Sequence, residues 1–557
     1  MRRGVSVVNK NVSSFPILFA LLALLIGACA VVFPASAQAA PPTAGSITVS
    51  GTVASSYDAY QIFSANVVDG DGDVKIATDI AWASDAARDA VLPVLHGAGM
   101  PKSQTTAQEA AEWLNADSHL TSALSAQLAR SLQSSGAVSV ALNAGTAAEL
   151  PCGYWLIVAG DRAIAQNEAG TAPIMALVGG SAVTVKPKAA TPKVAKHVLE
   201  DGAAWQKAAD ATVADDLYWR LSATVPAGLS AYDTYAVQFV DTMSAGLDPS
   251  KVAASMHVYV AAGAEGGFDA VSTGKDGRAG TKPAKGWADI TAQCVTKVAA
   301  DGTFTVRTGD LIAALGGADA FTAGARVVAV YDAPLTSGCN HGIAKGNPNE
   351  VYLRYPRSPF ADQSGDTGFT HTPSDDATAY TWGLSLIKRS STNDNPLAGA
   401  KVRITDDRGR TLAADGTWTT DADAYVVSGE DGRLELNGVD TGAYTVEEVA
   451  APKGYTAFEG KRTVTVAADG LDVEQVAAAK PKVTVSAESP LRVDAADAGS
   501  GSIELSVLNT PSKEASRGFM PSTGDRTLVL VAALTAIGLA AIVAALVIKR
   551  GGGRHDK

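Results

Sequence analysis

The chain has 557 residues, which at roughly 150 residues per domain predicts three to four domains. Its 45 Lys and Arg against 57 Asp and Glu give a formal net charge of −12, and such an acidic chain lacks the basic face that nucleic-acid binding requires. Hydrophobic residues reach 46% and Cys occupies only 4 positions, which excludes both a chain disordered by composition and a disulfide-dense scaffold.

Residues 1–39 form the first predicted element, an export signal. Basic residues at positions 2, 3 and 10 precede an apolar run over 15–33, and small residues follow over 35–40. This order is typical of a cleaved leader, with cleavage expected after Ala37 or Ala39. Lipid attachment at Cys29 is the alternative, but the apolar run and a better cleavage site continue beyond that residue. The mature chain is therefore expected outside the cell.

Residues 40–185 form a first region with both kinds of periodicity. Apolar and polar residues alternate over 46–49 and 60–63, apolar residues recur at helical spacing over 85–135, and strand-like runs close the region at 154–158 and 182–185. We expect a β-sheet domain with added helical segments. A Lys, Pro and Ala-rich stretch over 186–193 follows and predicts an extended connection.

The next two regions are predicted to be β-sandwiches. In the middle region, 194–360, short strand-like runs at 219–225, 235–239, 257–260 and 326–331 are separated by turn clusters. A polar boundary over 356–380 leads to the third region, 381–510, with alternating runs at 401–404, 434–436, 444–447 and 463–466. Residues 511–519 are read as a short polar stalk.

The C-terminal segment, 520–557, has three parts in a fixed order. Met-Pro-Ser-Thr-Gly at 520–524 precedes an uncharged stretch over 528–548, long enough at about 20 residues to span a bilayer, and a basic end follows. The segment resembles a sortase cell-wall sorting signal, usually Leu-Pro-x-Thr-Gly, with Met520 in place of Leu. The resemblance implies cleavage between Thr523 and Gly524, which makes Thr523 an acyl donor. The alternative is a plain single-span membrane protein.

Three motifs of the third region occur together. They are Pro-Leu-Ala-Gly-Ala-Lys-Val at 396–402, Asn-Gly-Val-Asp-Thr-Gly-Ala-Tyr-Thr-Val-Glu-Glu at 437–448 and Ala-Pro-Lys-Gly-Tyr at 451–455. This region resembles the collagen-adhesin B-type (Cna B) domain of Gram-positive surface proteins. The resemblance implies an intramolecular isopeptide bond between Lys388 and Asn509, promoted by Glu448. Glu447 is the rival carboxyl group, and strand alternation places the two Glu residues on opposite faces.

The chemistry of such a trio follows from burial. A Lys buried on a sandwich strand is desolvated, so its pKa falls and its amine becomes a nucleophile. A carboxyl group buried beside it stays protonated and can polarise the amide carbonyl of the Asn. Attack by the amine then expels ammonia.

The middle region carries a parallel pattern. Thr-Pro-Lys-Val-Ala-Lys-His-Val at 191–198 opens it, Phe-Val-Asp-Thr-Met-Ser-Ala-Gly-Leu at 239–247 follows, and Asn-Pro-Asn-Glu-Val-Tyr-Leu at 347–353 closes it. It resembles the middle domain of Gram-positive major (backbone) pilins. The resemblance implies Lys196 as nucleophile, Asp241 as catalytic carboxyl group and Asn349 as acceptor. Lys193 and Asn347 are the nearest rivals.

The junction between the first two regions resembles the pilin motif of the same family, usually Tyr-Pro-Lys-Asn. Here it reads Lys186-Pro187-Lys188-Ala189, so Pro and Lys match while the flanking residues depart. The resemblance implies that Lys188 attacks the sortase-bound Thr523 of another subunit. Lys186 is the alternative nucleophile.

Other candidate sites give weaker patterns. Asp69, Asp71 and Asp73 have the spacing of a calcium-loop start, but Val74 stands where that loop needs Gly, which favours a simple turn. The seven His residues show neither His-Glu-x-x-His nor His-x-His spacing, and we expect no metal and no cofactor. Cys294 and Cys339 could form a disulfide, which leaves Cys152 unpaired in the mature chain or requires a different pairing.

These patterns predict an all-β dominated chain of three tandem Ig-like β-sandwich domains, the first with added helical segments. We expect a secreted, cell wall-anchored shaft subunit of a surface fimbria, and not an enzyme, because no nucleophile motif of a hydrolase is present. Its expected partners are a pilus-specific sortase, identical subunits, minor or tip pilins, peptidoglycan and a host surface ligand. A wall-anchored monomeric adhesin or minor pilin is the alternative.

Overall fold

The computed structural model describes residues 5–8, 43–51, 54–72, 74–116, 119–159, 166–187, 191–200, 204–227, 229–263, 286–317, 324–359, 363 and 365–512. Most of the predicted export signal, Lys188 and the whole sorting signal with Thr523 and Gly524 lie outside these residues. The chain divides into two compact units: the first holds 1–340, 346–380 and 471–479, and the second holds 341–345, 381–470 and 480–557. The predicted first region and all of the predicted middle region except 341–345 fall in the first unit.

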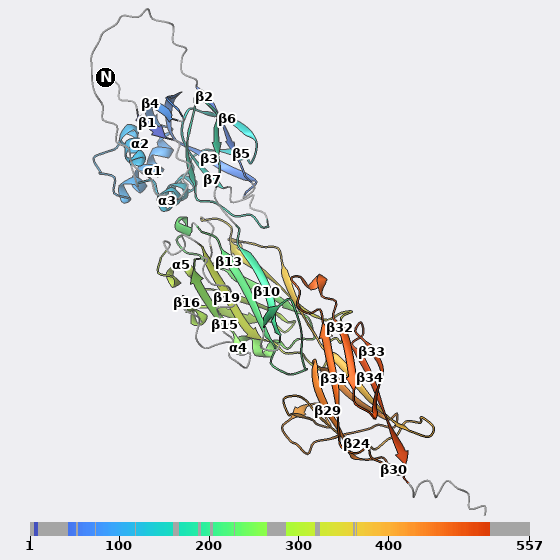
Figure 1. The fold of residues 1–557 in the computed structure, drawn as a ribbon. Coiled ribbons are helices and arrows are strands. Elements are labelled where there is room, and N and C mark those ends of the chain that lie inside the picture. Colours follow the sequence, from blue (N-terminus) through green and yellow to red (C-terminus); the bar gives the residue numbers. More distant parts are fainter. Residues whose placement is uncertain are drawn as a thin grey trace, which may run out of the picture. The chain divides into compact units, whose positions relative to one another are not determined.

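In its described residues, the first region combines two sheets with three helices (Figure 1). Its strands are β1 Val5–Val8, β2 Ala44–Val49, β3 Ser56–Asp69, β4 Val74–Trp82, β5 Ser139–Asn143, β6 Ala147–Pro151, β7 Gly153–Ala159, β8 Ile174–Val178 and β9 Val183–Val185. The larger sheet has the order β1-β4-β3-β7-β8 with β5 beside β3, and the smaller has the order β6-β2-β9. β1 lies inside the predicted export signal.

Three helices fill the stretch where helical periodicity was expected. They are α1 Asp85–Gly97, α2 Ala107–Asn115 and α3 Ser122–Ser134, and each begins after a Ser or Thr whose side chain accepts a backbone N–H of the first turn. Their buried residues, such as Val91 and Leu128, pack with Phe63 and Leu156 of β3 and β7 in one core. The prediction of helices added to a sheet domain is therefore confirmed.

The middle region is a sandwich of two sheets. Its strands are β10 Lys193–Glu200, β11 Ala204–Gln206, β12 Ala208–Asp210, β13 Tyr218–Val225, β14 Gln238–Met243, β15 His257–Ala262, β16 Trp287–Asp289, β17 Val295–Val298, β18 Thr303–Arg307, β19 Ala325–Asp332, β20 Asn347–Pro356, β21 Phe369–His371 and β22 Asp375–Tyr380. One sheet has the order β11-β10-β13-β19-β15-β16 and the other β12-β22-β20-β14-β18-β17, with β21 beside β20. Short helices α4 Val252–Ser255 and α5 Leu311–Ala314 and the 3₁₀ turns η1 Leu229–Ala231, η2 Pro249–Lys251 and η4 Thr291–Gln293 connect strands.

The middle sandwich extends past its expected end at 360. β22 continues the second sheet as far as Tyr380, because it pairs with β20 on one side and β12 on the other, and Ala377, Ala379 and Tyr380 are buried. From the sequence, this strand was assigned to the polar boundary over 356–380, because its residues, Asp-Asp-Ala-Thr-Ala-Tyr, include few large apolar side chains.

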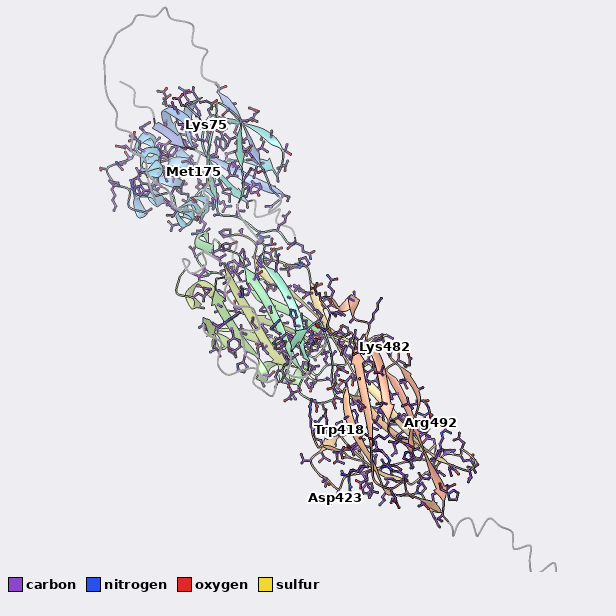
Figure 2. The ribbon with its side chains drawn as sticks, in the orientation of Figure 1. Lys75, Met175, Trp418, Asp423, Lys482 and Arg492 are labelled. Carbon is purple, nitrogen blue, oxygen red and sulfur yellow. The ribbon has the colours of Figure 1, made fainter. Side chains whose placement is uncertain are left out.

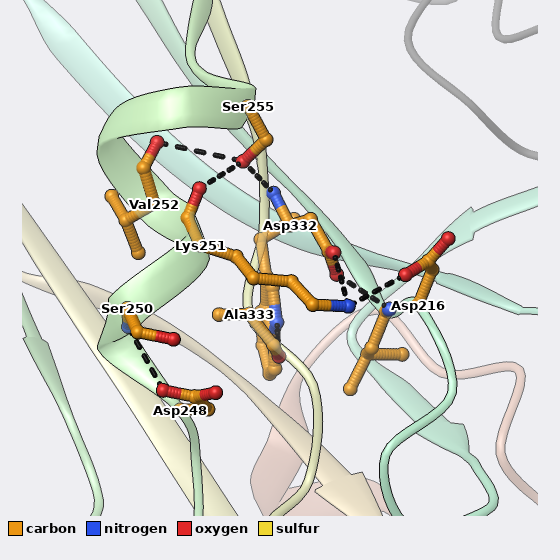
Figure 3. Close-up of polar contacts among 10 residues, drawn as sticks. Asp216, Asp248, Ser250, Lys251, Val252, Ser255, Asp332 and Ala333 are labelled. Atoms are coloured by element: carbon orange, nitrogen blue, oxygen red, sulfur yellow. Dashed lines mark hydrogen bonds and ion pairs between the residues drawn. The ribbon is translucent and has the colours of Figure 1, made fainter.

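A polar cluster holds the C-terminal end of β19. Lys251 Nζ lies 2.7 Å from Asp216 Oδ1 and 3.2 Å from Asp332 Oδ2, while the backbone N–H of Asp332 donates to Ser255 Oγ at 2.9 Å (Figure 3). Asp332 Oδ1 also accepts the backbone N–H of Leu217 at 2.8 Å. The end of β19 is thus fixed to α4 and to the start of β13.

The second unit is another sandwich of two sheets. Its strands are β23 Trp382–Ser390, β24 Lys401–Thr405, β25 Thr411–Leu412, β26 Trp418–Thr419, β27 Val426–Val427, β28 Arg433–Val439, β29 Gly442–Ala450, β30 Tyr455–Thr456, β31 Lys461–Asp469, β32 Lys482–Ala487, β33 Leu491–Asp497 and β34 Ser502–Pro511. One sheet has the order β28-β23-β34-β30 with β33 beside β34, and the other β26-β25-β24-β29-β31-β32 with β27 beside β24. Residues 471–479 of the connection between β31 and β32, which hold the 3₁₀ turn η6 Val476–Ala478, belong to the first unit.

The expectation of an all-β dominated chain with several sheets is confirmed in the residues described. The alternating runs at 401–404, 434–436, 444–447 and 463–466 all lie in strands. The run at 235–239 is strand only from Gln238 onward.

Candidate functional site

The second unit brings Lys388 and Asn509 together through the pairing of its first and last long strands. β23 and β34 are parallel neighbours in which Lys388 lies opposite Val507 and Ser390 lies opposite Asn509. Side chains two positions apart share a face, so Lys388 and Asn509 point to the same side of the sheet. Lys388 Nζ donates to Asn509 Oδ1 at 2.5 Å.

Glu448 approaches this pair from β29 of the opposite sheet. Its Oε1 lies 3.0 Å from Lys388 Nζ and accepts Asn509 Nδ2 at 2.7 Å, and its Oε2 accepts the backbone N–H of Phe458 at 3.0 Å. The neighbouring Glu447 faces outward and pairs with Arg403 Nη1 at 3.0 Å. One carboxyl oxygen therefore touches both the amine and the amide nitrogen.

Burial sets the electrostatics of this trio. The side chains of Lys388 and Glu448 are both fully buried, and Asn509 is 1% exposed. Desolvation lowers the pKa of Lys388, and the nearby Glu448 only partly opposes this effect. The Phe458 ring, with its centroid 5.3 Å from Lys388 Nζ, helps to exclude water. The amine is shifted toward the neutral, nucleophilic form.

The middle sandwich builds a second trio between its two sheets. Lys196 comes from β10 of one sheet, while Asp241 on β14 and Asn349 on β20 come from the other. All three are 0% exposed. Lys196 Nζ contacts Asp241 Oδ2 directly. Asn349 lies opposite Met243 on the adjacent strand, two residues along from Asp241, so the amide and the carboxyl group share a face.

Burial moves both titratable groups of the middle trio toward neutrality. It raises the pKa of Asp241 to about 6 and lowers the pKa of Lys196 to about 8, although each group opposes the shift of the other. Rings of Trp219 and Tyr331 each place their centroids 5.5 Å from Lys196 Nζ. A protonated carboxyl group and a neutral amine are the forms that amide exchange needs.

Two oxygens of the middle trio lack hydrogen bonds within the described part of the chain. Asp241 Oδ1 and Asn349 Oδ1 are buried and unsatisfied, a rare condition for buried polar atoms. A proton on Asp241 turns one of these acceptors into a donor, and the Asn349 carbonyl is an acceptor in the same cluster. The two unsatisfied oxygens, Asp241 Oδ1 and Asn349 Oδ1, therefore favour the protonated state of Asp241.

The rival residues of the middle region lie elsewhere. Lys193 is exposed. It lies three positions before Lys196 on β10, so the two side chains point to opposite faces of the strand. Asn347 is buried, but its side chain is used by backbone groups: Oδ1 accepts the N–H of Asn340 at 2.9 Å, and Nδ2 donates to the carbonyls of Asn340 and Ala379. Neither residue contacts the buried pair.

Sequence reasoning missed Tyr331, whose hydroxyl lies at the centre of the middle trio. It accepts Lys196 Nζ and Asn349 Nδ2, each at 2.9 Å, and donates to Asp241 Oδ2 at 3.3 Å. The available signal was a single Tyr at the end of the aliphatic run 326–331, since a buried hydroxyl needs a polar partner.

The first region buries a Lys without such a trio. Lys75 (Figure 2) is 5% exposed, and its Nζ donates to Asp69 Oδ1, the carbonyls of Gly179 and Ser181, and Ser181 Oγ. Asp69 also accepts the backbone N–H of Ser181 at 2.8 Å. These contacts give Asp69 a structural role at the hairpin, while Asp73 lies outside the described residues. Over the residues described, no cluster of three His, Cys, Asp or Glu side chains could hold a metal ion.

The suggested Cys294–Cys339 disulfide is not present, which corrects that expectation. Both thiols are free and partly buried. Cys294, beside η4, directs its Sγ to the carbonyl of Ile290 at 3.3 Å, whereas Cys339 lies in the β19–β20 connection beside Gly246. The two residues therefore pack at different places around the middle core.

Free thiols make a direct prediction. Burial raises the pKa of both Cys294 and Cys339 to about 11, so a thiol reagent should modify the native chain slowly. After unfolding without reductant, both residues should be fully alkylated when peptides are read by mass spectrometry. A peptide pair joined through Cys294 and Cys339 would contradict the structure.

The residues proposed for intermolecular linkage are only partly described. Lys186 is exposed, directly after β9. Lys188, Thr523 and Gly524 lie outside the described residues. Within the described part of the chain, no helix is both long and apolar enough to cross a membrane.

Comparisons with known proteins find likeness along most of the chain. A family model described as the prealbumin-like fold domain of SpaA matches residues 383–480. The chain is similar to the T6 backbone pilin of serotype M6 Streptococcus pyogenes, at 14% identity and a TM-score of 0.46 over 84% of this chain and 98% of that chain. It is also similar to the full-length major pilin SpaD from Corynebacterium diphtheriae, at 15% identity and a TM-score of 0.42 over 84% and 98%. For the major pilin BcpA of Bacillus cereus the values are 13% and 0.37 over 84% and 99%. No curated protein matches the chain.

Proposed function

We propose that this chain is the shaft subunit of a covalently polymerised surface pilus, stabilised by Lys196–Asn349 and Lys388–Asn509 isopeptide bonds. The observation that carries the proposal is the repeated trio. Each of two sandwiches buries a Lys, a carboxyl group and an Asn in mutual contact or joined through one hydroxyl, and each trio links an early strand to a late one. The SpaA-type match over 383–480 is consistent with this role.

Bond formation accounts for otherwise costly buried groups. A buried ion pair loses its hydration and is often no more stable than an apolar pair. In the proposed reaction the Lys nitrogen attacks the Asn side-chain carbonyl carbon, the protonated carboxyl group stabilises the carbonyl oxygen, and ammonia leaves with the former amide nitrogen. A neutral amide replaces the amine. Each of the two bonds forms once, so the chain modifies itself and turns over no external substrate.

The C-terminal sorting signal and the junction at 186–189 supply the proposed intermolecular chemistry. A sortase cleaves between Thr523 and Gly524 and transfers Thr523 to Lys188 of another subunit, with Lys186 as the alternative acceptor. Minor or tip pilins, peptidoglycan and a host ligand are the further proposed partners at the cell surface. The departures from the pilin motif at Lys186 and Ala189 favour the second candidate, a wall-anchored monomeric adhesin or minor pilin.

An immunoblot of cell-wall extracts from the native host tests polymerisation. Wild type should give a ladder of bands that survive SDS, and Lys188→Ala should collapse it to monomer, because the acyl acceptor is gone. Lys193→Ala removes another exposed linker-proximal Lys and is the matched control, for which the ladder should persist.

The remaining outcomes separate the candidates. A ladder that survives Lys188→Ala but not Lys186→Ala moves the acceptor to Lys186. Monomer alone in wild type, with active sortase present, contradicts the shaft and supports the monomeric adhesin.

A further inference from the structure

The two trios differ in how the carboxyl group reaches the amide. In the second unit, Glu448 Oε1 accepts Asn509 Nδ2 directly at 2.7 Å. In the middle sandwich the carboxyl group belongs to Asp241, one methylene shorter, and Asn349 Nδ2 donates instead to the Tyr331 hydroxyl at 2.9 Å. The hydroxyl occupies the position that the carboxylate oxygen has in the other trio.

Tyr331 is held firmly at this position. Its side chain is 0% exposed, and the ring meets Phe304 edge to face with centroids 4.8 Å apart. The next residue, Asp332, is anchored by the cluster around Lys251 (Figure 3). Because the ring and the next residue are both held in place, the hydroxyl is already oriented for reaction and no further ordering of Tyr331 is required.

We propose that Tyr331 is a catalytic residue for the Lys196–Asn349 bond, carrying a proton from the attacking amine to the departing amide nitrogen. This role rests on the proposed function. The geometry that supports it is the contact of one hydroxyl oxygen with both nitrogens, at 2.9 Å each.

The proton balance shows why such a carrier is needed. When neutral Lys196 Nζ donates its lone pair to the Asn349 side-chain carbon, the new C–N nitrogen becomes positively charged and acidic. At the same time Asn349 Nδ2 loses its amide resonance and becomes a basic amine. The Tyr331 oxygen takes a proton from Nζ. Its own proton, which is directed to Asp241 Oδ2 before the reaction, then passes to Nδ2, because the former amide nitrogen now has a free lone pair. The old C–N bond then breaks, ammonia leaves, and the hydroxyl is restored.

No bulk water reaches this site to do the same work, because the trio is fully buried. Burial also keeps the pKa of Tyr331 well above its usual value, so the hydroxyl holds its proton until the amide nitrogen needs it. In the second unit the ring near the amine belongs to Phe458, which has no hydroxyl, and there the Glu448 oxygen already touches both nitrogens.

The test is the rate of bond formation at both sites of one chain. Newly synthesised full-length chain is sampled over time, digested, and scored by mass spectrometry for the Lys196–Asn349 and Lys388–Asn509 cross-linked peptides. Tyr331→Phe should slow the first cross-link by on the order of 10²-fold or more, since a general acid–base contribution is typically about 10²–10⁴-fold. The second cross-link should form at the wild-type rate. Tyr259→Phe, on β15 of the same sheet and equally buried, is the matched control and should leave both rates unchanged.

Each other outcome decides the proposal. An unchanged Lys196–Asn349 rate in folded Tyr331→Phe overturns the role while leaving the proposed function intact. Absence of this cross-link in wild type overturns both. If Tyr331→Phe does not fold, Tyr331→3-fluorotyrosine keeps the ring and hydroxyl and makes the hydroxyl more acidic. A faster rate is then expected, because an amide nitrogen leaves only once it is protonated, so donation by the hydroxyl to this nitrogen limits the rate more than acceptance from Nζ. An unchanged rate overturns the role.

Discussion

Asn509→Ala should turn the second unit from a body that does not lengthen under load into one that unravels. In the proposed wild-type chain, force entering at β23 passes through the Lys388–Asn509 bond and leaves at β34, so the residues between them carry no load. The variant lacks the acyl carbon that Lys388 attacks. Its two strands are then held only by hydrogen bonds and packing.

The expected extension follows from the sequence separation. Lys388 and Asn509 are 121 residues apart, which corresponds to roughly 400 Å of extended chain at 3.3–3.6 Å per residue. Single-molecule pulling of the second unit between its ends should show this length as one unfolding step in Asn509→Ala and none in wild type.

Asn437→Ala is the matched control for this experiment. Asn437 is exposed on β28 of the same sheet, so its loss removes an amide without touching the buried Lys. The second unit of the Asn437→Ala variant should show no unfolding step, like that of the wild type. A full unfolding step in wild type would contradict the proposed bond.

The sequence predicted the strands of the sandwiches better than their limits. Alternating runs of branched and aromatic residues marked β13, β19 and β31 correctly, because burial of one or both faces leaves a repeating apolar pattern. β22 was missed because its sequence, Asp-Asp-Ala-Thr-Ala-Tyr, has no large aliphatic residue, although the strand lies between β12 and β20 in the sheet. Small residues give no hydrophobic pattern, so only the assembled sheet identifies the strand.

In the candidate site, only the residues that belong to recognisable motifs could be predicted from the sequence. The resemblance supplied Lys196, Asp241 and Asn349, and the structure places them together. Tyr331 could not be derived, because it is far from Lys196 in the chain and reaches it only when β13 lies between β10 and β19. Its hydrogen bonds depend on sheet order and register, which local patterns do not encode.

Glu448→Gln should abolish the Lys388–Asn509 bond, whereas Glu447→Gln should leave it complete. The first substitution keeps the size of the side chain but removes the carboxyl group that touches both reacting nitrogens. The second removes only a half-buried partner of Arg403 on the opposite face of the same strand. Adjacent residues thus separate a role in bond formation from a general effect of lost charge.

The stability of the second unit should depend on whether the Lys388–Asn509 bond has formed. By analogy with a disulfide that closes a loop of similar length, loss of the bond costs on the order of 5 kcal/mol, which lowers the melting temperature of the second unit by about 10–20 °C. Glu448→Gln also leaves the Lys388 amine buried without the carboxyl group that contacts it, which adds to the loss. Calorimetry and the cross-linked peptide mass should therefore change together in Glu448→Gln and stay near wild type in Glu447→Gln. A cross-link that forms fully in Glu448→Gln would show that the amine and the amide react without this carboxyl group, and the catalytic role would pass to the burial of Lys388 alone.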